Sequence, residues 1–150
     1  MEAISLTPEN YQKVFELIKT FSDQYLLLPK SLEEIKQISE DFRIVVEDDK
    51  VVACAVLDVF TETLAEVRTL AVAPESQGRG FGKVLVEDCE NRAREIGIKR
   101  IFALTYKDNF FHKLGYRTVD KNSLPEKVLK TCVNCSLYNN CQEIAVLKDL

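Results

Sequence analysis

The stretch Pro74–Leu85, PESQGRGFGKVL, places three glycines and two basic residues between a strand-like apolar run and a helix-like one. Glycine lets a backbone approach a ligand closely because it has no Cβ to clash. The helix that follows presents unpaired N–H groups and the positive end of its dipole at its first turn. The stretch therefore predicts a site for a phosphate-type anion, with Gln77, Arg79 and Lys83 as side-chain donors. The alternative is a surface turn whose glycines serve geometry alone.

Two familiar nucleotide-binding motifs do not fit this stretch. A Rossmann turn needs G-x-G-x-x-G, but Gly78, Gly80 and Gly82 are spaced two residues apart. A P-loop needs Gly-Lys followed by Ser or Thr, and here Lys83 is followed by Val84. An anion-binding turn at these glycines would therefore be of another kind.

Composition and charge limit the classes of protein that the chain can belong to. With 150 residues, 46% of them hydrophobic, we expect a single globular domain over residues 1–150. A net charge of −4 gives no basic field for a nucleic-acid backbone. The chain has neither a leader-like N-terminus nor a run of roughly 20 apolar residues, so we expect a cytoplasmic protein that does not span a membrane.

Helices and strands are predicted on both sides of the glycine stretch from apolar periodicity. Ser31 with Glu34 forms a capping-box pattern, and Asp48–Lys50 is typical of a hairpin turn. Gly97 is the expected end of the helix that follows the glycines. The expected strands are 3–7, 42–48, 51–60, 63–73, 98–106, 116–120 and 143–150, and the expected helices are 8–21, 32–38, 81–96 and 108–115.

Two of these elements have predicted faces. The strand before the glycines should place one set of side chains on one face, namely Glu66, Arg68, Leu70 and Val72, and a second set on the other, namely Val67, Thr69 and Ala71. The helix after the glycines should bury one apolar stripe, namely Phe81, Val84, Leu85, Cys89, Ala93 and Ile96.

The run from Val72 to Gly82 resembles the V-x-x-x-x-[QR]-x-x-G-x-[GA] motif of the GNAT N-acetyltransferase superfamily, with Gln77, Gly80 and Gly82 at its defining positions. The run FFHKLGY, residues 110–116, resembles the segment that closes most such folds. The resemblance covers essentially the full chain. It implies an α/β (α+β) fold, with a mixed, mostly antiparallel sheet of about six to seven strands flanked by about four helices.

The same resemblance implies acetyl-CoA as the co-substrate and requires no metal for the chemistry. Backbone groups of Leu70, Ala71 and Val72 would pair with the pantetheine arm. A splay between the strand ending at Ala73 and the strand 100–106 would admit the thioester. The pyrophosphate would be held by the N–H groups of Gln77, Gly78, Arg79, Gly80, Phe81, Gly82 and Lys83.

Acetyl transfer to an amine needs a base, because an amine is an ammonium ion at neutral pH. Glu66 is the candidate, since partial burial on its strand would raise its pKa. The alternatives are a solvated glutamate and an ion pair with Arg68. A backbone N–H near Leu70 or Ala71 would stabilise the oxyanion, as the resemblance suggests.

The leaving thiolate needs a proton donor only if it is not expelled directly. Many members of the superfamily use a tyrosine four residues before the glycine of the closing segment, and this chain has Phe111 there. Tyr106, a water molecule or no acid at all would then serve. The alternative role for Tyr106 is that of a core aromatic at the end of its strand.

For the acceptor, the runs LLLPKSLEEI, LAEVRTLAV, IFALTYKDNFFHKLGY and LPEKV resemble compact bacterial amino-acid N-acetyltransferases of the N-acetylglutamate synthase type. This resemblance implies acetylation of the α-amino group of a small amino acid, with glutamate expected, as in arginine biosynthesis. Lys30, Ser31 and Arg68 are the acceptor-binding candidates. The alternatives are a helix-cap role for Ser31 and a solvated surface position for Lys30.

Two other functions stay open beside this one: a catalytically weak, CoA-binding regulatory module, and an N-acetyltransferase for a polyamine or a protein amine. The Gly-Arg-Asn-Ser type segment of the longer synthases is absent here. A homodimer is compatible with the sequence but is not indicated by it.

Five cysteines do not complete a disulfide framework. Cys54 and Cys89 lie inside apolar patterns and are expected to be ordinary buried thiols. Cys132, Cys135 and Cys141 have C-x2-C-x5-C spacing, which suits either a zinc site or free thiols in a loop. A fourth ligand is not apparent in the sequence.

Overall fold

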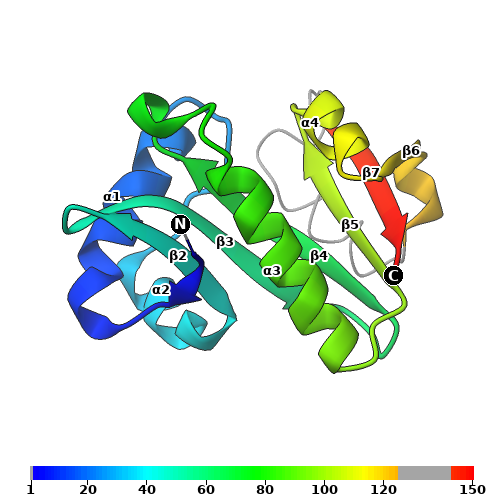
Figure 1. The fold of residues 1–150 in the computed structure, drawn as a ribbon, viewed down its shortest axis with the longest axis horizontal. Coiled ribbons are helices and arrows are strands. Elements are labelled where there is room, and N and C mark those ends of the chain that lie inside the picture. The colour runs from blue at the N-terminus through cyan, green and yellow to red at the C-terminus, as the bar shows by residue number, and fades with distance from the viewer. Residues whose placement is uncertain (1, 125–142) are drawn as a thin grey trace. The chain divides into compact units, whose positions relative to one another are not determined.

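The computed structural model describes residues 2–124 and 143–150 of the chain. Its strands form a seven-stranded sheet in the order β1-β2-β3-β4-β5-β7-β6, and the described residues contain four α-helices (Figure 1). The β1–β2, β2–β3, β5–β7 and β6–β7 pairs are antiparallel and the β4–β5 pair is parallel. This mixed sheet with its helices confirms the predicted fold class.

Contacts divide the chain into two compact units. The first unit comprises Met1–Asp58 and Val67–Arg92, and the second comprises Val59–Glu66 and Ala93–Leu150. The first unit contains β1 (Ile4–Ser5), α1 (Tyr11–Ser22), α2 (Leu32–Gln37), β2 (Phe42–Glu47), most of β3 (Lys50–Val59), the end of β4 (Leu64–Val72) and most of α3 (Phe81–Glu95). The second unit contains the start of β4, β5 (Arg100–Thr105), α4 (Asp108–Lys113), β6 (Arg117–Val119) and β7 (Ile144–Asp149).

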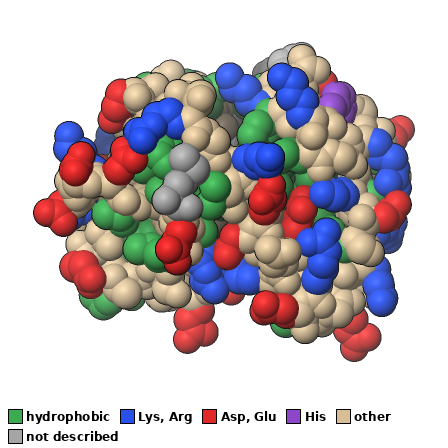
Figure 2. Space-filling view, in the orientation of Figure 1, with side chains coloured by type: hydrophobic (Ala, Val, Ile, Leu, Met, Phe, Trp, Pro, Cys, Tyr) green, Lys and Arg blue, Asp and Glu red, His purple; other side chains and the backbone are tan. Residues whose placement is uncertain are grey.

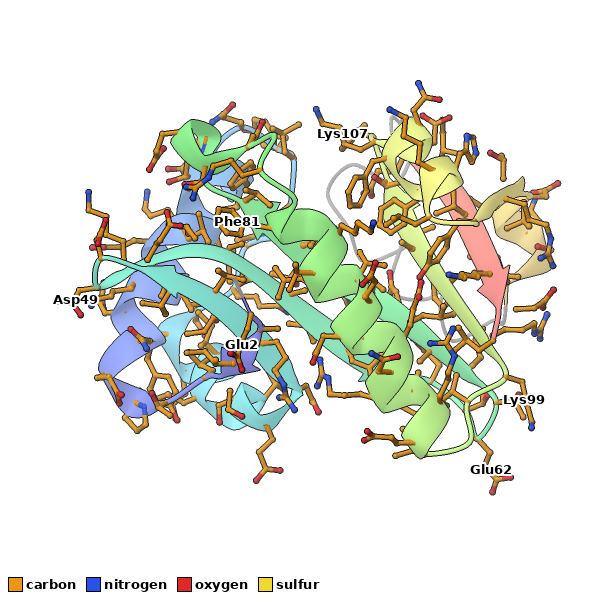
Figure 3. All side chains as sticks on the ribbon, in the orientation of Figure 1. Glu2, Asp49, Glu62, Phe81, Lys99 and Lys107 are labelled. Atoms are coloured by element: carbon orange, nitrogen blue, oxygen red, sulfur yellow. The ribbon has the colours of Figure 1, made fainter. Side chains whose placement is uncertain are left out.

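The hairpin between β2 and β3 turns where the sequence predicts. Asp48 and Asp49 have φ values of +51° and +63°. Two successive positive φ angles are the signature of a type I′ turn, whose twist matches that of the strands it joins. Figure 3 shows Asp49 at the tip of this hairpin.

The core of the first unit lies between α1, α2 and one face of the strands, while α3 crosses the opposite face (Figure 1). The buried members of the core are Leu6, Val14, Leu17, Ile18, Ile35, Phe42, Ile44, Val51, Cys54, Val56, Ala71 and Ala73.

The capping box predicted for α2 is present, because Ser31 Oγ accepts from the Glu34 N–H and Glu34 Oε1 accepts from the Ser31 N–H.

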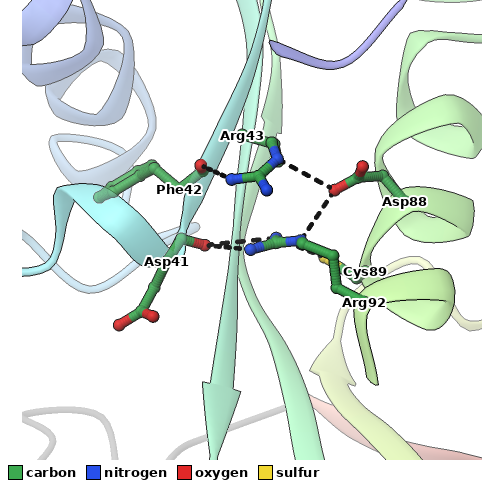
Figure 4. A network of polar contacts seen from close by, with 6 residues as sticks. All are labelled: Asp41, Phe42, Arg43, Asp88, Cys89 and Arg92. Carbon is green, nitrogen blue, oxygen red and sulfur yellow. Dashed lines mark hydrogen bonds and ion pairs between the residues drawn. The ribbon is translucent and has the colours of Figure 1, made fainter. Parts of the chain in front are cut away.

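A polar network ties α3 to the start of β2 (Figure 4). Arg92 Nε donates to Asp88 at 3.0 Å, and both terminal nitrogens of Arg92 donate to the Asp41 carbonyl at 3.3 Å. Arg43 Nε lies 3.7 Å from the same Asp88 carboxylate. Arg92 also donates to the buried Cys89 sulfur at 3.7 Å. These contacts join two elements that lie about 45 residues apart in the sequence.

The C-terminus of α3 corrects one predicted core position. Ile96, expected in the apolar stripe, is 59% exposed, whereas Ile98 is buried. Gly97 has φ +88°, and the N–H groups of Gly97 and Ile98 donate to the carbonyls of Arg94 and Ala93. This is the Schellman pattern, in which the residue after the glycine folds back onto the helix. Ile98 therefore takes the core position that helical periodicity assigned to Ile96.

The second unit has its own smaller core, in which the rings of Phe102 on β5 and Phe60 are tilted by 43° with centroids 5.7 Å apart. Phe111 is buried on α4, and its ring meets Tyr116 edge-on at 5.1 Å. Lys148 of β7 donates to the Leu114 carbonyl at 2.9 Å, which satisfies the end of α4. The buried members of this core are Leu64, Phe102, Leu124, Ala145 and Leu147.

The surface carries charges of both signs. Acidic and basic side chains are interspersed on the face shown in Figure 2, in keeping with the net charge of −4. None of the helices within residues 2–124 and 143–150 has the length and apolar character needed to cross a bilayer.

Candidate functional site

The glycine-rich turn between β4 and α3 has the backbone shape of an anion site. Gly78 and Gly80 have φ values of +82° and +89°, a region that side chains of other residues rarely allow. A Cβ placed on either glycine would meet no atom of the described chain within 4 Å. The glycines are thus required by the turn's conformation, and the space above them is open to a ligand.

Helix α3 begins directly after this turn. Its first residue, Phe81, is buried. Figure 3 labels Phe81 at this end of α3. The Val84 N–H donates to the Gly80 carbonyl at 3.1 Å, which closes the first helical turn. The N–H groups of Phe81, Gly82 and Lys83 precede this bond and have no acceptor within the helix. Together with the helix dipole, they make a suitable site for a phosphate group.

The side chains expected to assist this backbone have partners within the chain. Gln77 Nε2 donates to the Val72 carbonyl at 3.1 Å and so ties the turn to the end of β4. Lys83 lies 3.9 Å from Glu87, one helical turn away. Backbone groups of the turn are therefore better placed to meet a phosphate than the Gln77 amide.

Arg79 is held by the hairpin on the neighbouring strands. Its two terminal nitrogens donate to the two oxygens of Glu47 at 2.7 Å each, and its guanidinium lies 4.8 Å from the centre of the Phe81 ring. The Arg79 hydrogen bond lowers the pKa of the Glu47 carboxyl. A bidentate pair and a ring contact together fix the direction of this side chain.

Strand β4 contains a bulge at Thr69, whose φ of +55° is exceptional for a β-branched residue. Arg68 forms an ion pair with Asp58 at 2.9 Å, so their side chains lie on the same face of the sheet. Asp58 is four residues after Cys54 on β3, and an even spacing places both on one face. Cys54 belongs to the core of the first unit, so this is the face that packs against α1 and α2. Ala71 belongs to that same core. Residues three apart in a regular strand point to opposite faces. The predicted alternation is therefore wrong beyond Thr69, because the bulge returns Ala71 to the face of Arg68.

Cys54 lies against the bulge. Its Sγ donates to the Thr69 carbonyl at 3.4 Å, and the residue is fully buried. Burial raises the pKa of the Cys54 thiol to about 12, against opposing effects of the Ala71 N–H and the Lys30 ammonium. The thiol is therefore protonated at neutral pH and acts as a donor. The prediction of a buried thiol is confirmed, although nothing in the sequence near Cys54 indicated its partner.

The acceptor candidates occupy different settings. Lys30 is half-buried in the segment before α2, and its ammonium opposes the rise in the Cys54 pKa. Arg68 is 23% exposed and holds Asp58, a partner that sequence reasoning missed. Ser31 is exposed, and its capping bonds account for its presence as a helix cap. Lys30 and Arg68 both belong to the first unit.

The candidate base and acid lie in the second unit. Glu66 is only 6% exposed and pairs in register with Phe102 at the end of the parallel β4–β5 pairing, which excludes a solvated glutamate. Tyr106 is 36% exposed just after β5, so it is not a core aromatic. Phe111 is buried against Tyr116 and has no hydroxyl to donate.

Cys132, Cys135 and Cys141 lie outside the described residues. Within residues 2–124 and 143–150, no group of three or more His, Cys, Asp or Glu side chains could hold a metal ion.

Comparison with known proteins identifies relatives over nearly the whole chain. Residues 11–116 match the profile of the Acetyltransferase (GNAT) family. An uncharacterized N-acetyltransferase of Chlorobaculum tepidum is 32% identical over 91% of this chain and 88% of its own length. An amino-acid acetyltransferase of Neisseria meningitidis is 36% identical over 73% of this chain. The match covers only 26% of the length of that relative.

A solved structure extends the likeness to the fold. The N-acetylglutamate synthase of Neisseria gonorrhoeae, complexed with coenzyme A and N-acetylglutamate, superposes on 99% of this chain with a TM-score of 0.90 and 28% identity. The superposition covers 35% of the synthase chain.

Proposed function

Because this chain belongs to the GNAT family of acetyltransferases, we propose that it transfers the acetyl group of acetyl-CoA to the α-amino group of a small amino acid, with glutamate as the first candidate. The solved synthase that carries coenzyme A and N-acetylglutamate supports this proposal. A glutamate acceptor would place the enzyme in arginine biosynthesis.

The glycine turn before α3 is the observation that carries the proposal. Its two positive-φ glycines face open space, and the first amides of α3 have no acceptor in the helix. Coenzyme A offers a pyrophosphate, whose oxygens would accept from the N–H groups of residues 77–83. The bond between Gln77 and Val72 would keep this turn in register with β4, where the pantetheine arm would pair with Leu70, Ala71 and Val72.

The proposed chemical step uses a base, an oxyanion donor and a proton donor. Glu66, buried on β4, would take the proton of the acceptor ammonium directly or through a water molecule. The amine nitrogen would then attack the thioester carbon, and the oxyanion would accept from a β4 backbone N–H at Leu70 or Ala71. Cleavage of the carbon–sulfur bond would release the CoA thiolate, with Tyr106 or water as the proton donor.

Two cations of the first unit favour an anionic acceptor. Lys30 and Arg68 would offer opposite charge to a carboxylate that reached them. Asp58 holds the Arg68 guanidinium at 2.9 Å. A polyamine would meet repulsion from the same two cations.

A second candidate rests on Phe111. Its buried ring replaces the hydroxyl that many members of the family use as an acid, which is compatible with a CoA-binding module of weak activity. Binding of acetyl-CoA without transfer would distinguish this candidate from the enzyme.

The test is release of CoA thiol from acetyl-CoA, measured with glutamate, aspartate, glutamine, ornithine, lysine, spermidine and a peptide amine. Selective turnover of glutamate supports the proposal. Preference for spermidine contradicts the anionic acceptor, and binding of acetyl-CoA with no turnover in the whole panel favours the module. Arg68→Ala and Lys30→Ala should each raise the KM for the amino acid while leaving the KM for acetyl-CoA within about twofold.

A further inference from the structure

The bulge at Thr69 is a strained feature that needs support from outside its own strand. A threonine at φ +55° is in the left-handed region, where its branched Cβ is unfavourable. A bulge also interrupts the strand ladder, so that a backbone group there loses its regular partner. Such conformations persist only when surrounding contacts hold them in place.

Cys54 supplies that contact from β3. Its Sγ–H donates to the Thr69 carbonyl at 3.4 Å from a fully buried position. The Ala71 N–H acts on the same sulfur, because it opposes the rise that burial causes in the thiol pKa. Leu70, the residue directly after Thr69, carries one of the two candidate oxyanion amides, so the hold on Thr69 acts next to that N–H.

We propose that Cys54 is a positioning residue, whose thiol holds the Thr69 bulge and thereby directs the Leu70 N–H toward the thioester oxygen. This inference rests on the proposed acetyl transfer. The Cys54 thiol does not react. Attack by the neutral amine nitrogen forms the carbon–nitrogen bond while the thioester C=O pair moves to oxygen, and the nitrogen then releases its extra proton to water. The returning oxygen pair expels the CoA thiolate, which takes a proton from Tyr106 or water. During these steps Cys54 keeps its proton and its bond to Thr69.

The experiment compares substitutions at two buried cysteines. Cys54→Val keeps a similar volume but removes the donor, Cys54→Ala tests whether the bulk of valine matters, and Cys54→Ser restores a donor. Cys89→Val is the matched control, because Cys89 is equally buried but lies on α3, where its sulfur accepts from Arg92. Each variant is measured for kcat, for the KM of both substrates, for CoA affinity and for thermal stability.

We expect Cys54→Val and Cys54→Ala to lower kcat about tenfold, a smaller loss than deletion of an oxyanion donor causes. CoA affinity should stay within twofold, because the glycine turn that holds the pyrophosphate is untouched. Cys54→Ser should recover most of the wild-type kcat. Cys89→Val should have the wild-type kcat, even if Cys54→Val and Cys89→Val both lower thermal stability. An unchanged kcat in Cys54→Val, an equal loss in Cys89→Val, or no recovery in Cys54→Ser would overturn the inference.

A second readout does not depend on turnover. In ¹⁵N-labelled protein, Cys54→Val should shift the Leu70 and Ala71 amide resonances and speed their hydrogen exchange, whereas Cys89→Val should leave both unchanged. If the wild type acetylates nothing, the proposed function fails by itself. If the Leu70 and Ala71 amide resonances and exchange rates were also unchanged in Cys54→Val, the inference that Cys54 supports the bulge would be wrong as well.

Discussion

Two polar side chains on the strands, Glu66 and Cys54, are buried, and burial decides what each can do. Glu66 is the candidate base, whereas Cys54 is a thiol held neutral. A buried carboxylate is rarely retained without a partner or a task. Glu66 is therefore the residue at which a single exchange tests the chemistry.

Replacing Glu66 by glutamine should lower kcat about a hundredfold near pH 7, because the acceptor ammonium loses its general base. The loss should shrink as the pH rises toward the pKa of the acceptor amine, since a growing share of the amine is then already deprotonated. The measurement is kcat/KM of both proteins from pH 6 to 9. Glu62→Gln, at an exposed glutamate just before β4, is the control. A ratio that does not vary with pH would remove Glu66 from the mechanism.

At the scale of the element, the turn before α3 depends on glycine for shape. Gly80→Ala places a Cβ in open space but at φ +89°, which should cost about 1 to 2 kcal/mol of folding free energy. It should also weaken CoA binding at least tenfold, because the displaced amides no longer converge on the pyrophosphate. Titration calorimetry with CoA measures this effect.

Gly97→Ala is the matched control for that exchange. Gly97 has φ +88° and equally open surroundings, but it ends α3 at the opposite terminus. It should lower stability by a similar amount and leave CoA affinity unchanged. Equal CoA affinity in Gly80→Ala and the wild type would refute the assignment of the pyrophosphate to this turn.

The capping box of α2 separates two roles for Ser31. Ser31→Ala removes the acceptor for the Glu34 N–H and should cost about 1 kcal/mol, or roughly 2 to 4 °C in Tm for a chain of this size. Ser31→Asn should restore the cap. If the KM for the amino acid follows Tm through both variants, Ser31 acts only through the helix. A KM that rises in Ser31→Asn despite full stability would indicate direct contact with the acceptor.

At the scale of the whole molecule, the buried thiols make folding stability depend on alkaline pH. Burial raises the pKa of Cys54 to about 12 and that of Cys89 to about 11, from an ordinary value of 9.0. In the unfolded chain these thiols ionise first, so the native state binds more protons above pH 9. The stabilisation is complete below pH 9 and is lost as the pH rises toward 11 and 12.

We therefore expect the urea midpoint to fall between pH 8 and pH 10.5 by more in the wild type than in the Cys89→Val variant. The comparison cancels the titration of lysines, tyrosines and the remaining cysteines, which both proteins share. An identical fall in the two proteins would contradict the raised pKa of Cys89.

Local patterns accounted for much of this fold. The capping box at Ser31, the hairpin at Asp48 and Asp49, the glycine-ended helices and the turn before α3 each follow from residues within a few positions of one another. The backbone preferences of glycine, proline and capping residues act over that range. The family motif lies in one such segment, so the proposed CoA site could be located from sequence.

What sequence alone determined, then, was the order of the elements, the position of the glycine-rich turn and the family. Tertiary structure decided the partners: Cys54 with Thr69, Arg68 with Asp58, and Arg79 with Glu47, which are 15, 10 and 32 positions apart. It also decided the bulge, which changes the faces of β4. Strand register and bulges depend on pairing between distant segments, and the energy of each contact appears only when those segments meet.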